Sequence, residues 1–271
     1  MNAVVAADPV LLRLVAAVDC HAALAVAVSG GVDSMTLAHV VHRFARVPAT
    51  MYHATGPAVP AAARGRVEAH AARHGWRLVL LDAGELADER YRANPVDRCY
   101  YCKSNLYARI GEATADTIAS GTNRDDLADY RPGLRAAAEQ RVVHPYVDAG
   151  IAKADVYALA RRLGLADLQD LPAQPCLSSR VETGIPIAAP DLAFIDGVES
   201  ALAAALGAAA TLRCRLTHAG VVVELDAAAD AATAATARAI AAAACDAQGR
   251  RFAGVRAYRR GAAFLRVAAG D

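Results

Sequence analysis

The feature that most constrains the fold is an apolar run that ends in two adjacent glycines and leads into a second apolar stretch, AVAVSGGVDSMTL (residues 25–37). Residues 24–28 have the length and composition of a buried parallel strand, and residues 34–44 have a helical pattern. A tight connection from such a strand to a helix is typical of parallel sheets whose faces are covered by helices. We therefore expect an α/β sheet to begin here.

The alternation of strands and helices continues beyond this turn. Further strands are predicted at residues 49–55, 77–81 and 117–121, and further helices at residues 61–74, 105–115 and 153–163. This order predicts an α/β fold with a doubly wound parallel sheet.

A proline-containing segment, residues 168–187, interrupts the alternation, and the pattern then changes. Beyond it we expect a helix over 191–206, strands over 212–217 and 221–225, an alanine-rich helix to about residue 247, and strands over 255–258 and 264–267. That order predicts a smaller C-terminal α+β domain. The predicted domains are residues 1–180 and residues 181–271.

Composition excludes some classes of protein. The net charge is +1, whereas a dedicated nucleic-acid binder usually carries a strongly basic face. No uncharged apolar run is long enough to cross a bilayer, and the first residues lack the basic start and cleavage site of a signal peptide. We expect a cytoplasmic protein that does not bind membranes, in which the six cysteines do not form structural disulfides.

The glycine turn is a candidate anion site, because ligands of open α/β sheets bind where strands end and helices begin. Gly30 and Gly31 have no side chains, so backbone N–H groups can approach an anion, and the next helix directs its positive end there. Ser29 and Ser34 add hydroxyl groups, and Asp33 can help to hold Mg²⁺. The lysine of the common Gly-Lys-Ser/Thr loop is absent, and a glycine-rich turn without a ligand is the alternative.

Three cysteines form a second candidate site. Cys99 and Cys102 in RCYYCK have the C-x-x-C spacing that lets two thiolates reach one metal, and Cys176 follows in QPCLSSR. Spacing alone leaves a [4Fe–4S] cluster, a zinc site and no metal as equal alternatives. Ser179 and Arg180 make the turn after Cys176 suited to binding an anion beside a thiol. The remaining cysteines are interpreted as packing residues: Cys20, Cys214 and Cys245.

Several motifs together resemble one family. SGGVDS matches the SGGxDS signature of the PP-loop ATP pyrophosphatases, and within that superfamily the chain resembles the LarE sulfur transferases. The further motifs are RCYYCK, GTNRDDLADYRPGL (residues 121–134), the K-A-D of residues 153–155 and PCLSSR (residues 175–180). The resemblance covers about residue 20 to at least residue 226. It implies a PP-loop domain followed by a smaller domain.

The resemblance also implies an activity. LarE proteins use ATP to adenylate a carboxylate of pyridinium-3,5-biscarboxylic acid mononucleotide, forming AMP and pyrophosphate. They convert that carboxylate to a thiocarboxylate during synthesis of the nickel-pincer nucleotide cofactor. In one branch the cysteine that matches Cys176 gives up its own sulfur. In the other, three cysteines hold a [4Fe–4S] cluster that carries sulfide, and this chain, with Cys99, Cys102 and Cys176, resembles that branch.

Roles for individual residues follow from the resemblance. The catalytic residue is Cys176. The implied ATP site comprises Ser29, Gly30, Gly31, Asp33, Ser34, Ala54, Gly121 and Asp125. The implied substrate site comprises Ser179, Arg180, Arg213 and Arg215, the last two sharing one face of a strand. The implied metal ligands are Asp33 for Mg²⁺, the three cysteines for the cluster, and Glu199 and Glu224.

Two alternatives remain at this point. A PP-loop tRNA thiolation enzyme combines the same loop with cysteines, but it requires a basic RNA-binding surface. A non-enzymatic module that binds a nucleotide or carries a cluster is the other. The expected partners are a small-molecule substrate, a sulfide or other sulfur donor, and further copies of the chain in a homo-oligomer.

Overall fold

A computed structural model of the chain describes residues 8–128, 131–207, 212–259, 261 and 263. Within these limits the chain divides into two compact units. Unit 1 lies within Met1–Glu85 and Cys99–Gln174, and unit 2 lies within Leu86–Arg98 and Pro175–Asp271. The predicted division at residue 180 stays a prediction. The strand predicted over 264–267 lies outside the described residues.

The sheet of unit 1 has four parallel strands in the order β3-β2-β1-β4. They are β1 (Leu24–Ala27), β2 (Ala49–Ala54), β3 (Leu78–Leu81) and β4 (Thr117–Ser120), each within one residue of its predicted ends. The chain proceeds outward from β1 to β3 and then returns to the other side of β1 for β4. The topological switch point therefore lies between β1 and β4, where ligands of such sheets bind.

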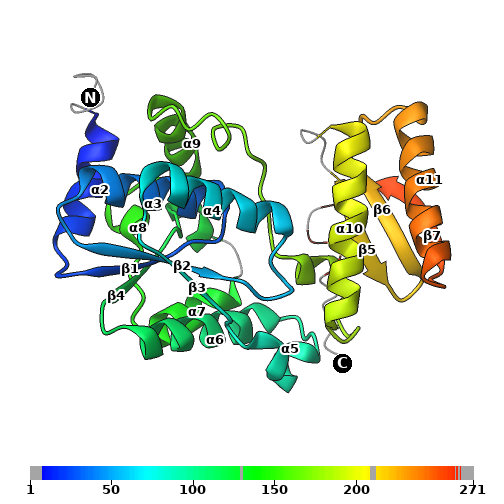
Figure 1. The fold of residues 1–271 in the computed structure, drawn as a ribbon, viewed down its shortest axis with the longest axis horizontal. Coiled ribbons are helices and arrows are strands. Elements are labelled where there is room, and N and C mark those ends of the chain that lie inside the picture. Colours follow the sequence, from blue (N-terminus) through cyan, green and yellow to red (C-terminus); the bar gives the residue numbers. More distant parts are fainter. Residues whose placement is uncertain (1–7, 129–130, 208–211, 260, 262, 264–271) are drawn as a thin grey trace. The chain divides into compact units, whose positions relative to one another are not determined.

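Helices cover both faces of this sheet (Figure 1). One face carries α2 (Pro9–Asp19), α3 (Val32–Phe44), α4 (Ala61–His74), α8 (Pro145–Asp148) and α9 (Lys153–Arg162), and the other carries α6 (Arg98–Ala113) and α7 (Pro132–Glu139).

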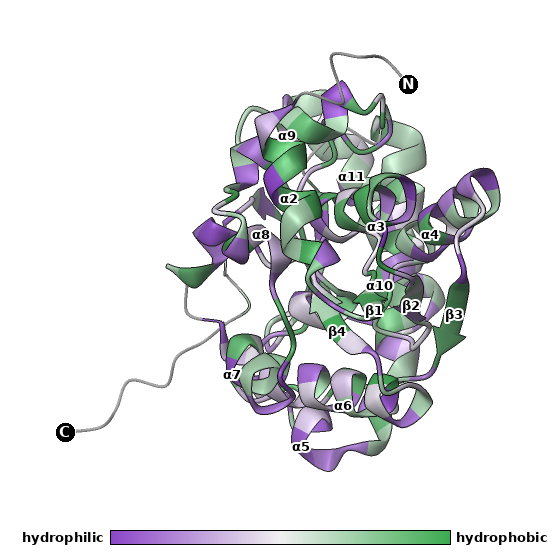
Figure 2. Ribbon diagram, turned by 90° about the vertical axis from the view of Figure 1, so that its left-hand side faces the viewer, coloured by the Kyte–Doolittle hydropathy of each residue, from purple (hydrophilic) through white to green (hydrophobic). Residues whose placement is uncertain are grey.

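The core explains this layering. Leu24 and Val26 of β1 pack toward the first group of helices, whereas Ala25 and Ala27 pack with Tyr107 and Ile110 of α6. β1 is thus buried on both faces, as expected of a central parallel strand. The edge strand β3 is also hydrophobic along its length (Figure 2).

Unit 2 contains a mixed three-stranded sheet. β5 (Leu212–Thr217) pairs antiparallel with β6 (Gly220–Leu225), and β6 pairs parallel with β7 (Phe252–Ala257). α10 (Ala189–Leu206) and α11 (Ala231–Ala247) pack on this sheet. Unit 2 also includes α5 (Glu89–Arg92) and the 3₁₀-helix η3 (Leu177–Arg180). A separate small mixed sheet with helices agrees with the α+β expectation.

Some elements differ from the sequence prediction. The helix expected over 105–115 begins at Arg98, so the C-x-x-C pair lies inside α6. The last described strand is Phe252–Ala257 rather than 255–258. The sequence did not predict α2, α7 or α8. Among the described residues, no helix is both long and apolar enough to span a membrane.

Candidate functional site at the switch point of unit 1

The loop between β1 and α3 closes on itself through its two serines. The Ser29 N–H donates to Ser34 Oγ at 3.0 Å, and the two hydroxyl oxygens are also 3.0 Å apart. Gly30 has φ +83°, and a Cβ atom there would lie 2.7 Å from the carbonyl oxygen of Ala63. This position therefore requires glycine for both its backbone conformation and its close approach to α4.

The start of α3 is open to an anion. Its N-cap residue is Gly31, which has no side chain to cap the helix. The first amides of a helix have no acceptor within that helix. Together with the helix dipole, they form a site that favours phosphate or carboxylate oxygens.

Asp33 links the two strands that flank the switch point. Its carboxylate accepts hydrogen bonds from Asn123 Nδ2, after β4, at 3.1 Å and from Lys153 Nζ, at the start of α9, at 2.5 Å. The Tyr146 hydroxyl donates to the Asp33 backbone carbonyl at 2.9 Å. Mg²⁺ is commonly held by one or two carboxylates together with phosphate oxygens. Asp33 supplies one such carboxylate, which in this structure is paired with the Lys153 ammonium.

Two other predicted ATP-site residues lie at the same edge of the sheet. Ala54 is the last residue of β2. Asp125, in the 3₁₀-helix η2 (Arg124–Leu127), accepts a hydrogen bond from the Lys153 backbone N–H at 3.0 Å. The residues after β1, β2 and β4 therefore share the carboxyl edge where a nucleotide would bind.

Gly121 allows the chain after β4 to approach α3. A Cβ atom at this position would lie 2.7 Å from the Ser34 backbone nitrogen and 2.9 Å from its Cα. Both obstructing atoms belong to the backbone, so they cannot move aside cheaply. The first turn of α3 consequently rests directly on a residue that has no side chain.

We predict that Gly121→Ala destabilises unit 1 by about 1–3 kcal/mol, the usual cost of overpacking, and weakens ATP binding because it displaces the first turn of α3. Gly111→Ala in α6 is the matched control, since a Cβ there meets nothing within 4 Å, and it should stabilise by up to about 1 kcal/mol. Urea unfolding followed by the fluorescence of the single tryptophan, Trp76, measures both. Equal stabilities of the two variants would contradict the packing argument.

Arg66 is a contact of the glycine loop that the sequence did not reveal. Its Nη1 donates to the Gly30 carbonyl at 2.7 Å and to Gln174 Oε1 at 3.1 Å. Burial lowers the pKa of its guanidinium, and Asp167 acts in the opposite direction. Lys153, Asn123 and Arg66 all reach the loop from distant parts of the sequence.

Cys99 and Cys102 are half-buried on α6. Residues three apart on a helix lie on one face, and this face continues to Leu106 and Ile110, which pack in the core beneath the sheet. Only a short connection joins the end of α6 to the start of β4. The cysteine end of α6 is therefore directed toward the carboxyl edge of β4. Two thiolates on one helix face fit part of the donor set of a thiolate-bound metal.

Cys176 lies in unit 2, at the N-cap of η3. Its carbonyl accepts hydrogen bonds from Ser179 Oγ at 2.7 Å and from Arg180 Nη1 at 3.0 Å. Arg180 is 3% exposed; its Nη1 also donates to the Pro175 carbonyl and to Ser179 Oγ, and its Nε and Nη2 donate to Glu199 at 3.0 and 2.9 Å. Arg180 and Ser179 thus fix the turn that presents Cys176.

One face of the unit 2 sheet carries charged side chains, which alternate along the strands with buried apolar ones. Glu224 is fully buried and accepts hydrogen bonds from Arg215 at 2.5 Å and from Arg256 at 2.8 and 3.0 Å. The guanidinium groups of Arg213 and Arg215 lie 5.9 and 6.0 Å from the centre of the Tyr258 ring. We call Arg213, Arg215, Glu224, Arg256 and Tyr258 the arginine face.

Glu199 and Glu224, expected from the family resemblance to bind a metal, are both paired with arginines. Every oxygen of both carboxylates accepts a hydrogen bond from an arginine, and Glu199 also accepts one from the Cys214 N–H at 2.9 Å. These partners suit structural ion pairs and do not favour a cation between them. In the part of the chain that the structure describes, no group of three or more His, Cys, Asp or Glu side chains is arranged to hold a metal.

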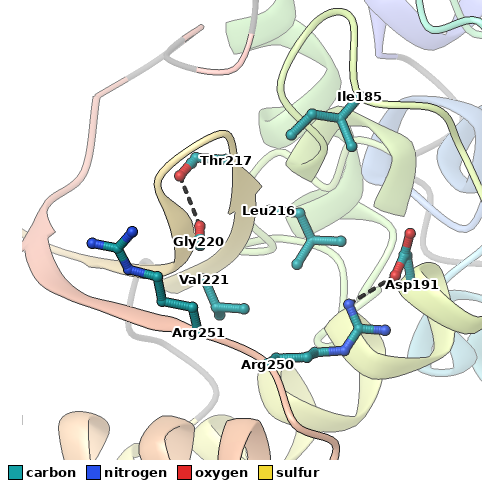
Figure 3. A pocket seen from close by; sticks show the side chains of 8 residues that line it. All are labelled: Ile185, Asp191, Leu216, Thr217, Gly220, Val221, Arg250 and Arg251. Carbon is teal, nitrogen blue, oxygen red and sulfur yellow. Dashed lines mark hydrogen bonds and ion pairs between the residues drawn. The ribbon is translucent and has the colours of Figure 1, made fainter.

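A hollow of about 260 Å³ in unit 2 lies apart from these residues (Figure 3). Its rim includes Arg250, which pairs with Asp191 at 2.7 Å, and its wall includes the turn closed by the hydrogen bond from Thr217 to Gly220. None of the residues predicted to form a site lines it.

No family model matches the chain. It is 37% identical over 163 residues to an uncharacterized protein of Synechocystis sp. (59% of this chain, 60% of that protein). It is 26% identical over 181 residues to an uncharacterized protein of Methanocaldococcus jannaschii (65% and 68%). It is 31% identical over 121 residues to the pyridinium-3,5-bisthiocarboxylic acid mononucleotide synthase of Lactiplantibacillus plantarum (43% and 44%).

The matches thus span 60% of the Synechocystis protein and under half of the Lactiplantibacillus protein. The name of the latter describes the product that the LarE resemblance implies. The comparison supports the resemblance to LarE over that part of the chain. The three-cysteine type stays a prediction.

Proposed function

We propose that this chain is an ATP-dependent sulfur transferase of the LarE type. It would adenylate a carboxylate of pyridinium-3,5-biscarboxylic acid mononucleotide and convert it to a thiocarboxylate in nickel-pincer cofactor synthesis. The observation that carries the proposal is the partial match to a protein named as a synthase of the bisthiocarboxylic acid mononucleotide. The small-molecule acceptor, a sulfur donor, a cytoplasmic location and a homo-oligomeric state belong to the same proposal.

The glycine loop supports the adenylation step. A carboxylate is a poor electrophile, and joining it to AMP provides a leaving group. The open amides at the start of α3 and the Lys153 ammonium would stabilise the negative charge of the departing pyrophosphate. Mg²⁺, held in part by Asp33, would neutralise further phosphate charge.

The cysteines and the arginine face support the second step. Cys99, Cys102 and Cys176 would ligate a [4Fe–4S] cluster, which would supply a transferable sulfide. Within the arginine face, Arg213 is half-exposed, and its guanidinium suits the recognition of a substrate phosphate. Among the described residues, no feature favours a tRNA acceptor over a small-molecule acceptor.

Product analysis tests the adenylation. With ATP, Mg²⁺ and the pyridinium dicarboxylate mononucleotide, we expect pyrophosphate and AMP. Release of ADP or inorganic phosphate instead would contradict the proposal. Omitting the acceptor is the control, since acyl adenylate formation requires it.

Iron and sulfide analysis tests the cluster. We expect anaerobically purified wild type to contain iron and acid-labile sulfide, and Cys99→Ala to lose most of both. Cys20→Ala is the matched control, because this exposed thiol contacts the Ala17 carbonyl at the end of α2 and should leave the iron content unchanged. Wild type without iron, or Cys99→Ala with full iron content, would remove the cluster from the proposal.

A further inference from the structure

An imidazole lies at the carboxyl edge of the unit 1 sheet, next to the switch point. Val143 forms a parallel bridge with Ala119 of β4, with backbone hydrogen bonds of 2.8 and 3.0 Å. It therefore extends the sheet by one position beyond β4. His144 follows Val143 directly. Gly121 likewise follows β4, and Ser29 lies two residues beyond the end of β1, so all three emerge at the same edge.

A hydroxyl pair fixes the ring of His144. Ser120 Oγ lies 2.8 Å from His144 Nδ1 and 3.0 Å from Thr122 Oγ1. When the Ser120 hydroxyl donates to Thr122, it accepts the Nδ1–H of His144, and this leaves Nε2 with a lone pair. Ser120 is 6% exposed, so water competes little for this contact. The arrangement orients a neutral imidazole with one basic nitrogen.

The surroundings of the ring favour its neutral form. Burial is the main cause that lowers the pKa of His144 below its usual 6.5. Lys103 of α6 acts in the same direction, whereas Asp148 of α8 and Asp126 of η2 act against it. A histidine that is unprotonated at neutral pH can accept a proton during a reaction.

Lys103 also relates His144 to the cysteine helix. It lies one turn beyond Cys99 on α6, and its ammonium is 5.5 Å from the centre of the buried Tyr107 ring. The charge of Lys103 acts on His144, and the start of α6 is directed toward the same carboxyl edge of the sheet. His144 and the end of α6 that carries two of the predicted sulfur ligands thus both belong to the carboxyl edge of the unit 1 sheet.

We propose that His144 is the proton acceptor for the sulfur nucleophile in the second half-reaction; this inference rests on the proposed function. An S–H group attacks the acyl carbon of the acyl adenylate. The C–S bond forms, the C–O bond to AMP breaks, and its electron pair leaves on the phosphate oxygen. The proton from sulfur passes to Nε2 and then to solvent. No oxidant or reductant is required, and the co-reactant is hydrosulfide.

The test separates the two half-reactions in single turnover with added sodium hydrosulfide. For His144→Gln we expect pyrophosphate release within about twofold of wild type and thiocarboxylate formation slowed at least about tenfold at pH 7. General bases commonly contribute 10²–10⁴-fold, and the partial ionisation of hydrosulfide reduces that effect. The defect should shrink toward pH 9, where the nucleophile is ionised without help. His218→Gln, an exposed histidine of unit 2, is the control and should match wild type.

A second variant isolates the orientation of the ring. Ser120→Ala keeps the imidazole and removes its hydroxyl partner, so we expect a smaller loss in the same half-reaction. An unchanged rate and pH profile in His144→Gln would overturn the inference, as would an equal fall in both half-reactions. If wild type releases no pyrophosphate or forms no thiocarboxylate, the proposed function itself is wrong and the role of His144 falls with it.

Discussion

Replacing Glu224 with alanine is expected to destabilise unit 2 by about 3–5 kcal/mol, the usual cost of removing one partner from a buried ion pair. Glu224 is fully buried at the centre of the arginine face and pairs with two arginines. Without it, the guanidinium of Arg215, which is 6% exposed, loses its counter-charge in a dry environment. The penalty comes from that stranded cation more than from the lost hydrogen bonds.

Amide hydrogen exchange in β5 and β6 is the measurement, because the two strands hold the network. Trp76 fluorescence serves as the reference for unit 1, which should not change. Glu68→Ala is the matched control: its pair with Arg64 is 2.8 Å long, but both side chains are more than 40% exposed, so it should cost less than about 1 kcal/mol. Glu224→Gln keeps acceptors and removes charge, so we expect an intermediate loss. If Glu224→Ala costs no more than Glu68→Ala, the arginine face does not stabilise the sheet.

Much of the unit 1 fold was predictable, because its information is local. The four strands are short apolar runs, and two adjacent glycines between a strand and a helix indicate a tight turn. The start of α6 was not predictable in the same way. Tyrosine and cysteine are weak helix formers, so RCYYC reads as a loop although the structure makes it helical.

The contacts of the candidate site join residues that are far apart in the sequence, and the hydrophobic pattern of the sequence does not show such contacts. Asp33 meets Lys153 across 120 positions of sequence and Asn123 across 90. The K-A-D motif containing Lys153 was visible, but its partner was not. Likewise, the sequence shows that Arg213 and Arg215 share one face of β5. It does not show that Glu224 of β6 lies beside Arg213 on one side and beside Arg256 of β7 on the other.

The long-range contacts also change the roles of the arginines that are predicted to bind the substrate. The family resemblance predicts substrate contacts for Arg180 and Arg215, yet both side chains are nearly inaccessible and each is paired with a glutamate. Their described contacts position the Cys176 turn and the sheet. Arg213 is the half-exposed member of the set, so any phosphate contact is more readily made there, with the buried pairs holding the strand in place.

Acidification is expected to destabilise unit 1 by about 3 kcal/mol between pH 6.5 and pH 4. His39 of α3 is 3% exposed, and burial, followed by its charged neighbours, lowers its pKa from 6.5 to about 4. The neighbours are His42 and Arg43 on α3 and His70 and His74 on α4. In this window the unfolded chain binds a proton that the folded chain does not, so stability falls as the pH falls. The magnitude follows from about 1.4 kcal/mol for each unit of pKa difference.

Urea unfolding at pH 7 and pH 4, followed by Trp76 fluorescence, measures this effect where it arises. The Trp76 ring stacks on His74, with centres 6.2 Å apart, and His74 meets His39 edge-on at 4.8 Å. In His39→Leu, the stability at pH 7 should stay within about 1 kcal/mol of wild type, because Nδ1 of His39 is buried without a hydrogen-bond partner among the described residues. On acidification His39→Leu should lose less stability than wild type. His42→Gln, at an exposed position, should lose as much as wild type. Parallel pH profiles for wild type and His39→Leu would show that another group senses the acid.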